Sequence, residues 1–123
     1  MNYVFNAHLE PPLRYVHRQS LKYIQELLNL PIPAEVMGII LFGSSVKQTC
    51  RPESDIDIYL LVEHEDIEYL NDVIDKVQTL VRGIGKHFDI LADTPQRMVE
   101  KARKFGTVEN KFWDSGVILY EKQ

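Results

Sequence analysis

The sequence contains one cysteine, Cys50, so no disulfide can form within the chain, which fits a reducing compartment. No apolar run approaches the ~20 residues that a membrane-spanning helix needs. The N-terminal residues lack the cationic start and the apolar segment of a secretory signal. We therefore expect a cytoplasmic protein with no membrane partner.

The chain also has no excess of positive charge. Its 14 Lys and Arg residues face 18 Asp and Glu residues, which gives a net charge of -4, whereas domains that coat nucleic acid are usually basic. Nucleic acid is therefore not an expected partner. A P-loop nucleoside triphosphatase is excluded as well, since the sequence has no G-x-x-x-x-G-K-S/T pattern.

The composition is that of an ordinary globular protein. Hydrophobic residues make up 45% and charged residues 26% of the 123 residues, values typical of a soluble domain. A chain of this length buries roughly two-thirds of its unfolded surface on folding. We therefore expect residues 1–123 to form a single domain.

Two apolar runs separated by a polar connection organise the chain. The first run ends in a Gly-Ser pair, and ten residues later the second begins with Asp-Ile-Asp. Because side chains alternate along a strand, Asp55, Asp57 and Tyr59 should share one face, and only the other, aliphatic face should be core. Two carboxylates this close repel each other unless a cation lies between them. The pattern indicates a site for Mg²⁺ or Mn²⁺; a lone D-x-D is more often a solvated edge or a turn.

The Gly-Ser turn is a candidate phosphate site. Gly43 has no Cβ, so a ligand can approach its backbone closely. Ser44 or Ser45 can cap a short helix whose free N–H groups would face an anion. Lys47 adds a positive charge one turn further on. These four residues are the candidate nucleotide-binding residues.

Asp89 is the candidate third carboxylate. Residues 87–91 alternate like a short strand, with Phe88 and Ile90 on one face and Asp89 on the other. An acid in an apolar strand destabilises the fold unless it is paired or binds a metal. Taken alone, Asp89 is better explained as a capped or water-bonded residue. Together with Asp55 and Asp57, it is better explained as a metal ligand.

Hydrophobic periodicity predicts the remaining elements. The predicted helices span residues 13–30, 66–82 and 94–104, and the predicted strands span residues 35–42, 54–62, 87–91 and 117–120. We expect residues 111–114 to form a turn that packs the only tryptophan onto the sheet edge. The order of elements predicts an α/β (α+β) sandwich in which a mixed sheet of about four strands packs against helices.

The last predicted helix carries a cluster of cations, Arg97, Lys101, Arg103 and Lys104. The simpler interpretation of this cluster is a solvated helix face. The alternative is a surface that binds phosphate or a partner.

The segment GSSVKQTCRPESDID, from Gly43 to Asp57, together with FDIL around Asp89, resembles the minimal nucleotidyltransferase (MNT) domains of the DNA polymerase β-like superfamily. The closing segment GVILYE is similar to the C-terminal strand of that group. The resemblance covers about residues 21–120 and implies the nucleotidyltransferase fold. Gln48 is a departure, since many relatives carry glycine at this position.

The resemblance implies a mechanism and site residues. Asp55 and Asp57 would hold two divalent ions, Mg²⁺ or Mn²⁺, that clamp ATP or another nucleoside triphosphate. Asp89 would complete the shell of the second ion and orient or deprotonate an acceptor hydroxyl. Gly43 and Ser44 would hold the β- and γ-phosphates. The reaction would transfer a nucleoside monophosphate, most simply AMP, and release pyrophosphate.

The resemblance also implies a protein partner. Larger superfamily members carry a second domain that binds the acceptor, and 123 residues leave no room for one. In the MNT group the partner is a small helical HEPN protein, often in a toxin–antitoxin pair in which the MNT protein adenylylates a tyrosine of the HEPN ribonuclease. Two alternatives stay open: a binding module that neutralises a partner by contact, which Gln48 favours, and a transferase acting on an antibiotic. Whether the chain forms a homodimer stays open too.

Overall fold

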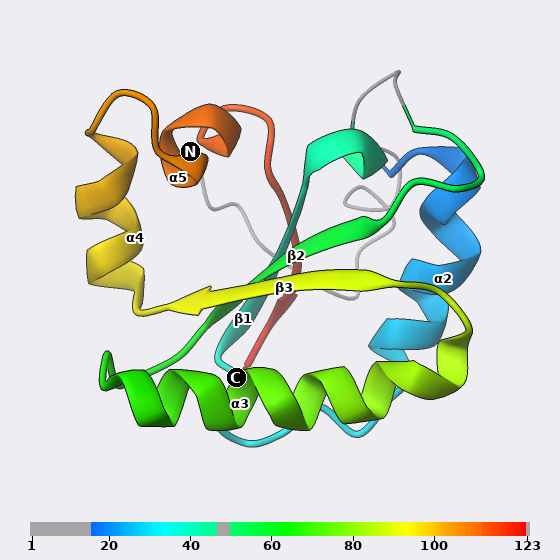
Figure 1. Ribbon diagram of the computed structural model, residues 1–123, viewed down its shortest axis with the longest axis horizontal. Helices are drawn as coiled ribbons and strands as arrows, with labels where there is room; N and C mark the ends of the chain where they lie inside the picture. The colour runs from blue at the N-terminus through cyan, green and yellow to red at the C-terminus, as the bar shows by residue number, and fades with distance from the viewer. Residues whose placement is uncertain (1–15, 47–49, 123) are drawn as a thin grey trace.

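The computed structural model describes residues 16–46 and 50–122. In this part of the chain, the strands are β1 (Gly38–Phe42), β2 (Ile56–Leu61), β3 (Phe88–Asp93) and β4 (Val117–Glu121). The helices are α2 (Arg18–Leu28), α3 (Ile67–Val81), α4 (Pro95–Ala102) and α5 (Val108–Phe112), with short 3-10 turns η1 (Gly43–Val46) and η2 (Arg82–Ile84). Figure 1 shows these helices arranged around one sheet.

The strands pair in the order β3-β2-β1-β4. β1 is antiparallel to both β2 and β4. β2 and β3 are parallel, because the chain crosses back through α3 between them. The predicted mixed sheet of about four strands is therefore confirmed, and the apolar run of residues 35–42 contributes an inner strand, as expected.

Side-chain caps determine where three of the helices begin. Asp66, Thr94 and Thr107 stand directly before α3, α4 and α5. Each accepts a hydrogen bond from the backbone N–H three residues further on, at 3.3, 3.2 and 3.0 Å. Helix α2 starts at Arg18 rather than at residue 13, which lies outside the described residues. Within residues 16–46 and 50–122, no helix has the length and apolarity needed to cross a membrane.

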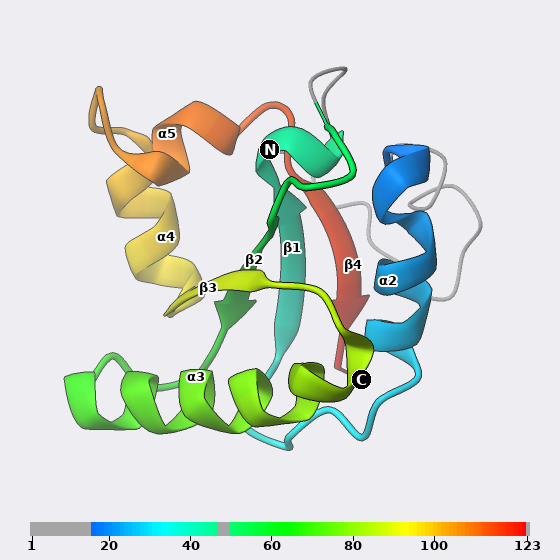
Figure 2. The same cartoon turned by 45° about the vertical axis from the view of Figure 1, so that its right-hand side comes forward.

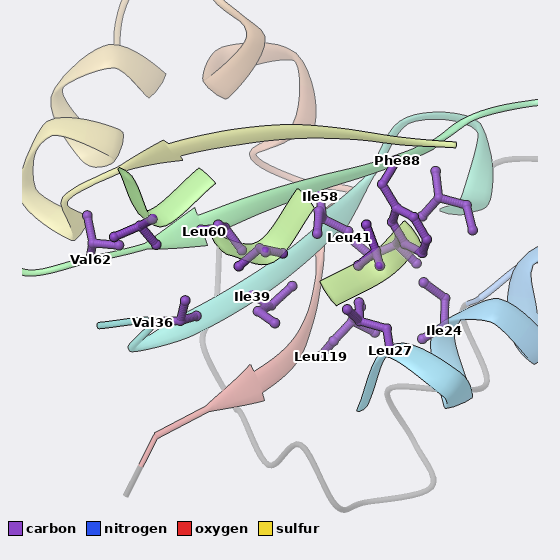
Figure 3. Packing of buried hydrophobic residues seen from close by; sticks show 14 of the residues in the cluster. Ile24, Leu27, Val36, Ile39, Leu41, Ile58, Leu60, Val62, Phe88 and Leu119 are labelled. Atoms are coloured by element: carbon purple, nitrogen blue, oxygen red, sulfur yellow. The ribbon is translucent and has the colours of Figure 1, made fainter. Parts of the chain in front are cut away.

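One face of the sheet packs against α2 and α3. Aliphatic side chains from alternate strand positions meet Ile24 and Leu27 of α2 and a row of valines on α3, and all of them are buried. Figure 3 shows this packing around Leu41, Ile58 and Phe88. The alternation predicted for the second apolar run is confirmed on this face, where Ile56, Ile58 and Leu60 are fully buried.

The opposite face is partly covered as well, which corrects one expectation. Tyr59 was expected to share an open face with the carboxylates, yet it is only 1% exposed. It packs in a second apolar cluster with Met98 of α4 and Phe112 of α5. Figure 2 shows α4 and α5 on one side of the sheet and α2 on the other. Both faces are therefore core at the level of Tyr59.

Helix α5 replaces the turn expected at residues 111–114. Its buried aromatic residue is Phe112, which is 2% exposed, while Trp113 at the helix end is only partly buried against the same cluster. Phe112 stacks on Phe42 at the end of β1, with ring centroids 4.9 Å apart. This contact brings α5 close to the strand end that leads into η1.

Candidate active site

Two predicted carboxylates meet at the start of β2 and β3. Asp57 and Asp89 are register partners in these parallel strands, so their side chains emerge on the same face of the sheet. Asp55 lies two residues before Asp57, in the chain that leads into β2. Helices α4 and α5 cover the same face at Tyr59, further along β2. The three acids therefore lie toward the opposite end of that face from the part that α4 and α5 cover.

Asp57 is the most perturbed of the three acids. Burial, then the charge of Asp89 and a hydrogen bond with it, then the charge of Asp55, raise its pKa to about 6. Asp55 and Asp89 are exposed. Within residues 16–46 and 50–122, no lysine or arginine forms an ion pair with any of the three. A concentration of negative charge that no lysine or arginine of the described residues offsets is a suitable environment for a cation.

Gly43 closes the site from the side of β1. Phe42 is the register partner of Asp57, so the chain turns at Gly43 directly beside that carboxylate. The backbone of Gly43 has φ +73°, and a Cβ placed there would lie 2.1 Å from the Asp57 Oδ2 atom. Any side chain at position 43 would therefore displace the Asp57 carboxylate. The Asp57 carboxylate lies close to this glycine, in the space that a side chain at position 43 would need.

The other candidate nucleotide-binding residues differ in their placement. Ser44 is partly buried in η1, next to Gly43. The Ser45 side chain is fully buried, its Oγ atom 2.8 Å from that of Ser20 on α2. The Ser45 carbonyl accepts a hydrogen bond from the N–H of His17. The Ser45 hydroxyl thus anchors η1 to α2, while Lys47 and Gln48 lie outside the described residues.

His87 is the site neighbour that the sequence analysis missed. Its Nδ1 atom lies 3.2 Å from Asp55 Oδ2 and 3.8 Å from Asp89 Oδ1. One ligand atom from each of these three residues falls within 4.8 Å of the others. The available signal was its spacing, because His87 precedes Asp89 by two residues and therefore shares its face.

The cations of α4 are not simply a solvated face. Arg97 and Lys101 both donate to the buried Asp93, through Nε at 2.9 Å and Nζ at 2.6 Å. Burial acts to raise the pKa of Asp93, but the hydrogen bonds from Lys101 and the Thr94 N–H, with the nearby positive charges, hold it below its usual range. Two members of the predicted basic cluster therefore fasten α4 to the end of β3.

Comparison with known families identifies the chain. Over residues 22–123 the sequence matches the family described as polymerase beta, nucleotidyltransferase. The chain belongs to this family. The mixed α and β architecture described above is thus the nucleotidyltransferase fold, as the motif resemblance implied. The family also establishes a nucleotidyltransferase type of function for this chain at the level of the superfamily.

Two solved structures resemble the chain. One is a crystal structure of a toxin–antitoxin with AMP-PNP, with a TM-score of 0.50 and 23% identity over 83% of this chain and 73% of that one. The other is a mutant of the toxin–antitoxin MntA-HpeT, with a TM-score of 0.49 and 19% identity over the same shares. The first likeness supports the fold alone. No curated protein matches this sequence.

Proposed function

We propose that this chain transfers a nucleoside monophosphate, most simply AMP from ATP, to a hydroxyl group on another molecule and releases pyrophosphate. The observation that carries the proposal is the register pairing of Asp57 with Asp89, with Asp55 beside them and the Gly43 turn against Asp57. Paired carboxylates at an open sheet face suit metal-assisted phosphoryl chemistry. Membership of the nucleotidyltransferase family supports the same reaction class.

The donor set fits a divalent cation. Asp57 on β2 and Asp89 on β3 are register partners, and Asp55 directly precedes β2. Burial first, and then the negative charges of Asp89 and Asp55, raise the pKa of Asp57, and a nearby cation would offset those charges. Oxygen ligands of this kind are those that Mg²⁺ and Mn²⁺ accept. Asp55, Asp57 and Asp89 would hold the ions. When bound, such ions neutralise charge on the triphosphate and stabilise the attacking and leaving oxygens.

The chain's own residues then have distinct roles. Asp57, placed against the Gly43 turn, would help to hold the ions that bind the triphosphate. The acceptor hydroxyl oxygen forms a bond to the α-phosphorus while the bond from that phosphorus to the bridging oxygen breaks, so pyrophosphate leaves. Asp89 is exposed and carries the carboxylate that orients the hydroxyl and takes its proton. Gly43, Ser44 and Lys47 are the residues that we assign to the β- and γ-phosphates.

The acceptor belongs to the same proposal. The motif resemblance favours a tyrosine on a HEPN-type protein, in a toxin–antitoxin pair where this chain is the antitoxin. The toxin–antitoxin neighbour with AMP-PNP is in keeping with such a pair. A phenolic acceptor suits the site chemically, because a phenol with pKa near 10 needs only a partial transfer of its proton to a carboxylate during attack.

Label transfer from α-phosphate-labelled ATP tests this function. The wild type and Asp57→Asn are incubated with Mg²⁺ or Mn²⁺ and lysate of the source cells, and labelled proteins are separated by mass. A labelled band that requires the wild-type chain is the expected result. Asp75→Asn is the matched control, because Asp75 is an exposed acid on α3, which packs on the other face of the sheet. It should transfer label at the wild-type rate.

Other outcomes have defined meanings. Full metal-dependent transfer by Asp57→Asn would contradict the site assignment. Label that stays on the chain itself would indicate self-modification in place of a partner. No label anywhere, combined with no ATP binding by calorimetric titration, would contradict the transferase and favour the binding module, for which Gln48→Gly is the first variant to examine.

A further inference from the structure

We propose that His87 donates a nitrogen ligand to the ion held by Asp55 and Asp89, so that the site binds Mn²⁺ in preference to Mg²⁺. This inference rests on the proposed function, because it concerns the same metal site. It adds a residue that the carboxylate motif does not contain. It also gives the site a metal preference that a set of three carboxylates alone would not have.

The spacing of the atoms is the first support. Ligand atoms lie ~2.1 Å from ions of this kind, so two ligands at neighbouring coordination positions are about 3 Å apart and two opposite ligands about 4 Å apart. The distances from His87 Nδ1 to Asp55 Oδ2 and Asp89 Oδ1 are 3.2 and 3.8 Å. Both distances fall within that range. One ion can therefore contact all three residues with only small side-chain movements.

The backbone holds His87 in this position. Its carbonyl accepts a hydrogen bond from the N–H of Ile56 at 3.0 Å, so His87 is tied to the residue that follows Asp55. The preceding residue, Lys86, donates through Nζ to the Pro52 carbonyl at 2.7 Å. The segment before β3 is thus fastened to the segment before β2 at two points. These contacts place the backbone of His87 beside Asp55, so that its side chain needs only a rotamer that faces the acids.

The chemistry of the donor set gives the metal preference. Mg²⁺ strongly prefers oxygen ligands and keeps several waters, whereas an imidazole nitrogen suits transition metals. Mn²⁺ accepts a mixed set of nitrogen and carboxylate ligands. The three side chains are exposed by 47 to 62%, so an ion can reach them from solvent. A site with His87 should therefore discriminate against Mg²⁺.

The competing role for His87 is that of an internal counter-ion. In that case its ring would pair with Asp55 and Asp89 only in the metal-free protein, and an incoming ion would displace it. The two roles predict opposite changes in metal affinity when His87 is removed. Removal of a ligand weakens metal binding, whereas removal of a competing cation strengthens the binding of Mn²⁺ and Mg²⁺ alike.

Calorimetric titration of the full chain with MnCl₂ and with MgCl₂ separates these roles. We expect His87→Ala to weaken Mn²⁺ binding by about tenfold or more and Mg²⁺ binding by much less, so that the affinity ratio collapses. The matched control is His64→Ala, since His64 is exposed and contacts the Tyr69 ring, away from the acids. It should leave both affinities unchanged. An unchanged or increased Mn²⁺ affinity in His87→Ala would overturn the inference.

Two further readouts connect this test to the proposed function. In the nitrogen NMR spectrum of the wild type, Zn²⁺ should shift the Nδ1 signal of one histidine. That signal should be absent from the spectrum of His87→Ala. A chain that transfers label but keeps its Mn²⁺ to Mg²⁺ ratio in His87→Ala contradicts this inference alone. A chain that binds Mn²⁺ through His87 but transfers no label contradicts the proposed reaction alone. Absence of metal binding in the wild type would overturn both.

Discussion

Asp57 and Asp89 occupy the same register position on two adjacent parallel strands. The pair unites two distant stretches of sequence, because α3 carries the chain back so that β3 runs beside β2. Within the pair the environments differ, since Asp57 is partly buried beside Gly43 and Asp89 is exposed. Asp57 is therefore the more enclosed ligand of the proposed metal site, while Asp89 is open to an incoming acceptor as well as to an ion.

Asp57→Asn should stabilise the metal-free protein and at the same time abolish metal-dependent transfer. The raised pKa of Asp57 means that the folded state favours the protonated acid, so its ionised form destabilises the metal-free protein at neutral pH. Asn has nearly the same shape without the charge. We expect the free energy of unfolding at pH 7.5 without metal to rise by ~1 kcal/mol, measured by urea denaturation, while metal-dependent transfer is lost.

A fall in stability of more than about 1 kcal/mol would show that the Asp57 carboxylate is structural and would contradict this expectation. Asp75→Asn on α3 controls for the change from acid to amide and should alter neither quantity.

Gly43→Ala should damage the site more than the fold. A non-glycine residue at positive φ costs about 1–2 kcal/mol. The added Cβ would also meet the Asp57 Oδ2 atom at 2.1 Å, and the carboxylate would have to rotate away from the metal position. We expect a moderate loss of stability by urea denaturation and a loss of Mn²⁺ binding by calorimetry.

Gly106→Ala is the matched control for backbone strain. Gly106 also has positive φ, at +90°, but a Cβ there meets no atom within 4 Å. The two variants should therefore lose similar stability, while Gly106→Ala should keep wild-type Mn²⁺ affinity. Equal metal affinity in both variants would argue against contact between Gly43 and the working carboxylate.

The sequence was most informative where local chemistry alone decides the structure. Alternating apolar residues predicted β2 and the faces of Ile58 and Asp57, and hydrophobic periodicity predicted helices over residues 66–82 and 94–104, where α3 and α4 lie. These features depend on neighbours within a few residues. They are therefore visible without the fold.

The features that were missed depend on tertiary contacts. Tyr59 is buried because α4 and α5 cover its face, and α5 spans only Val108–Phe112, too short to show helical periodicity. The role of His87 depends on the register that places it beside Asp55. Asp93 was overlooked because the predicted strand stopped at residue 91, before the acid that Arg97 and Lys101 bind.

Asp93 should make the protein sensitive to acid. Its folded pKa lies below the unfolded value near 3.9, so its stabilising effect is complete above that value and is lost as pH falls through the folded pKa. We expect Asp93→Asn to cost about 3 kcal/mol at pH 7 and to flatten the dependence of the unfolding free energy on pH below about 5. Urea denaturation from pH 3 to 7 measures both effects.

A variant whose unfolding free energy keeps the wild-type slope below pH 5 would contradict the assignment of this acid sensitivity to Asp93. Asp75→Asn, at an exposed position, should preserve the wild-type slope.

Tyr59→Phe should loosen α5 from the sheet. The Tyr59 hydroxyl donates to Glu109 Oε2 at 2.8 Å, and Glu109 is only 7% exposed, with Lys101 Nζ 4.0 Å away. Loss of this donor leaves a buried carboxylate poorly satisfied, which should lower the free energy of unfolding by about 2 kcal/mol. In a Glu109→Gln background the acceptor is neutral, so the same substitution should cost about 1 kcal/mol. A double-mutant cycle by urea denaturation gives the coupling energy directly, and a value near zero would mean that the charge of Glu109 does not strengthen this hydrogen bond.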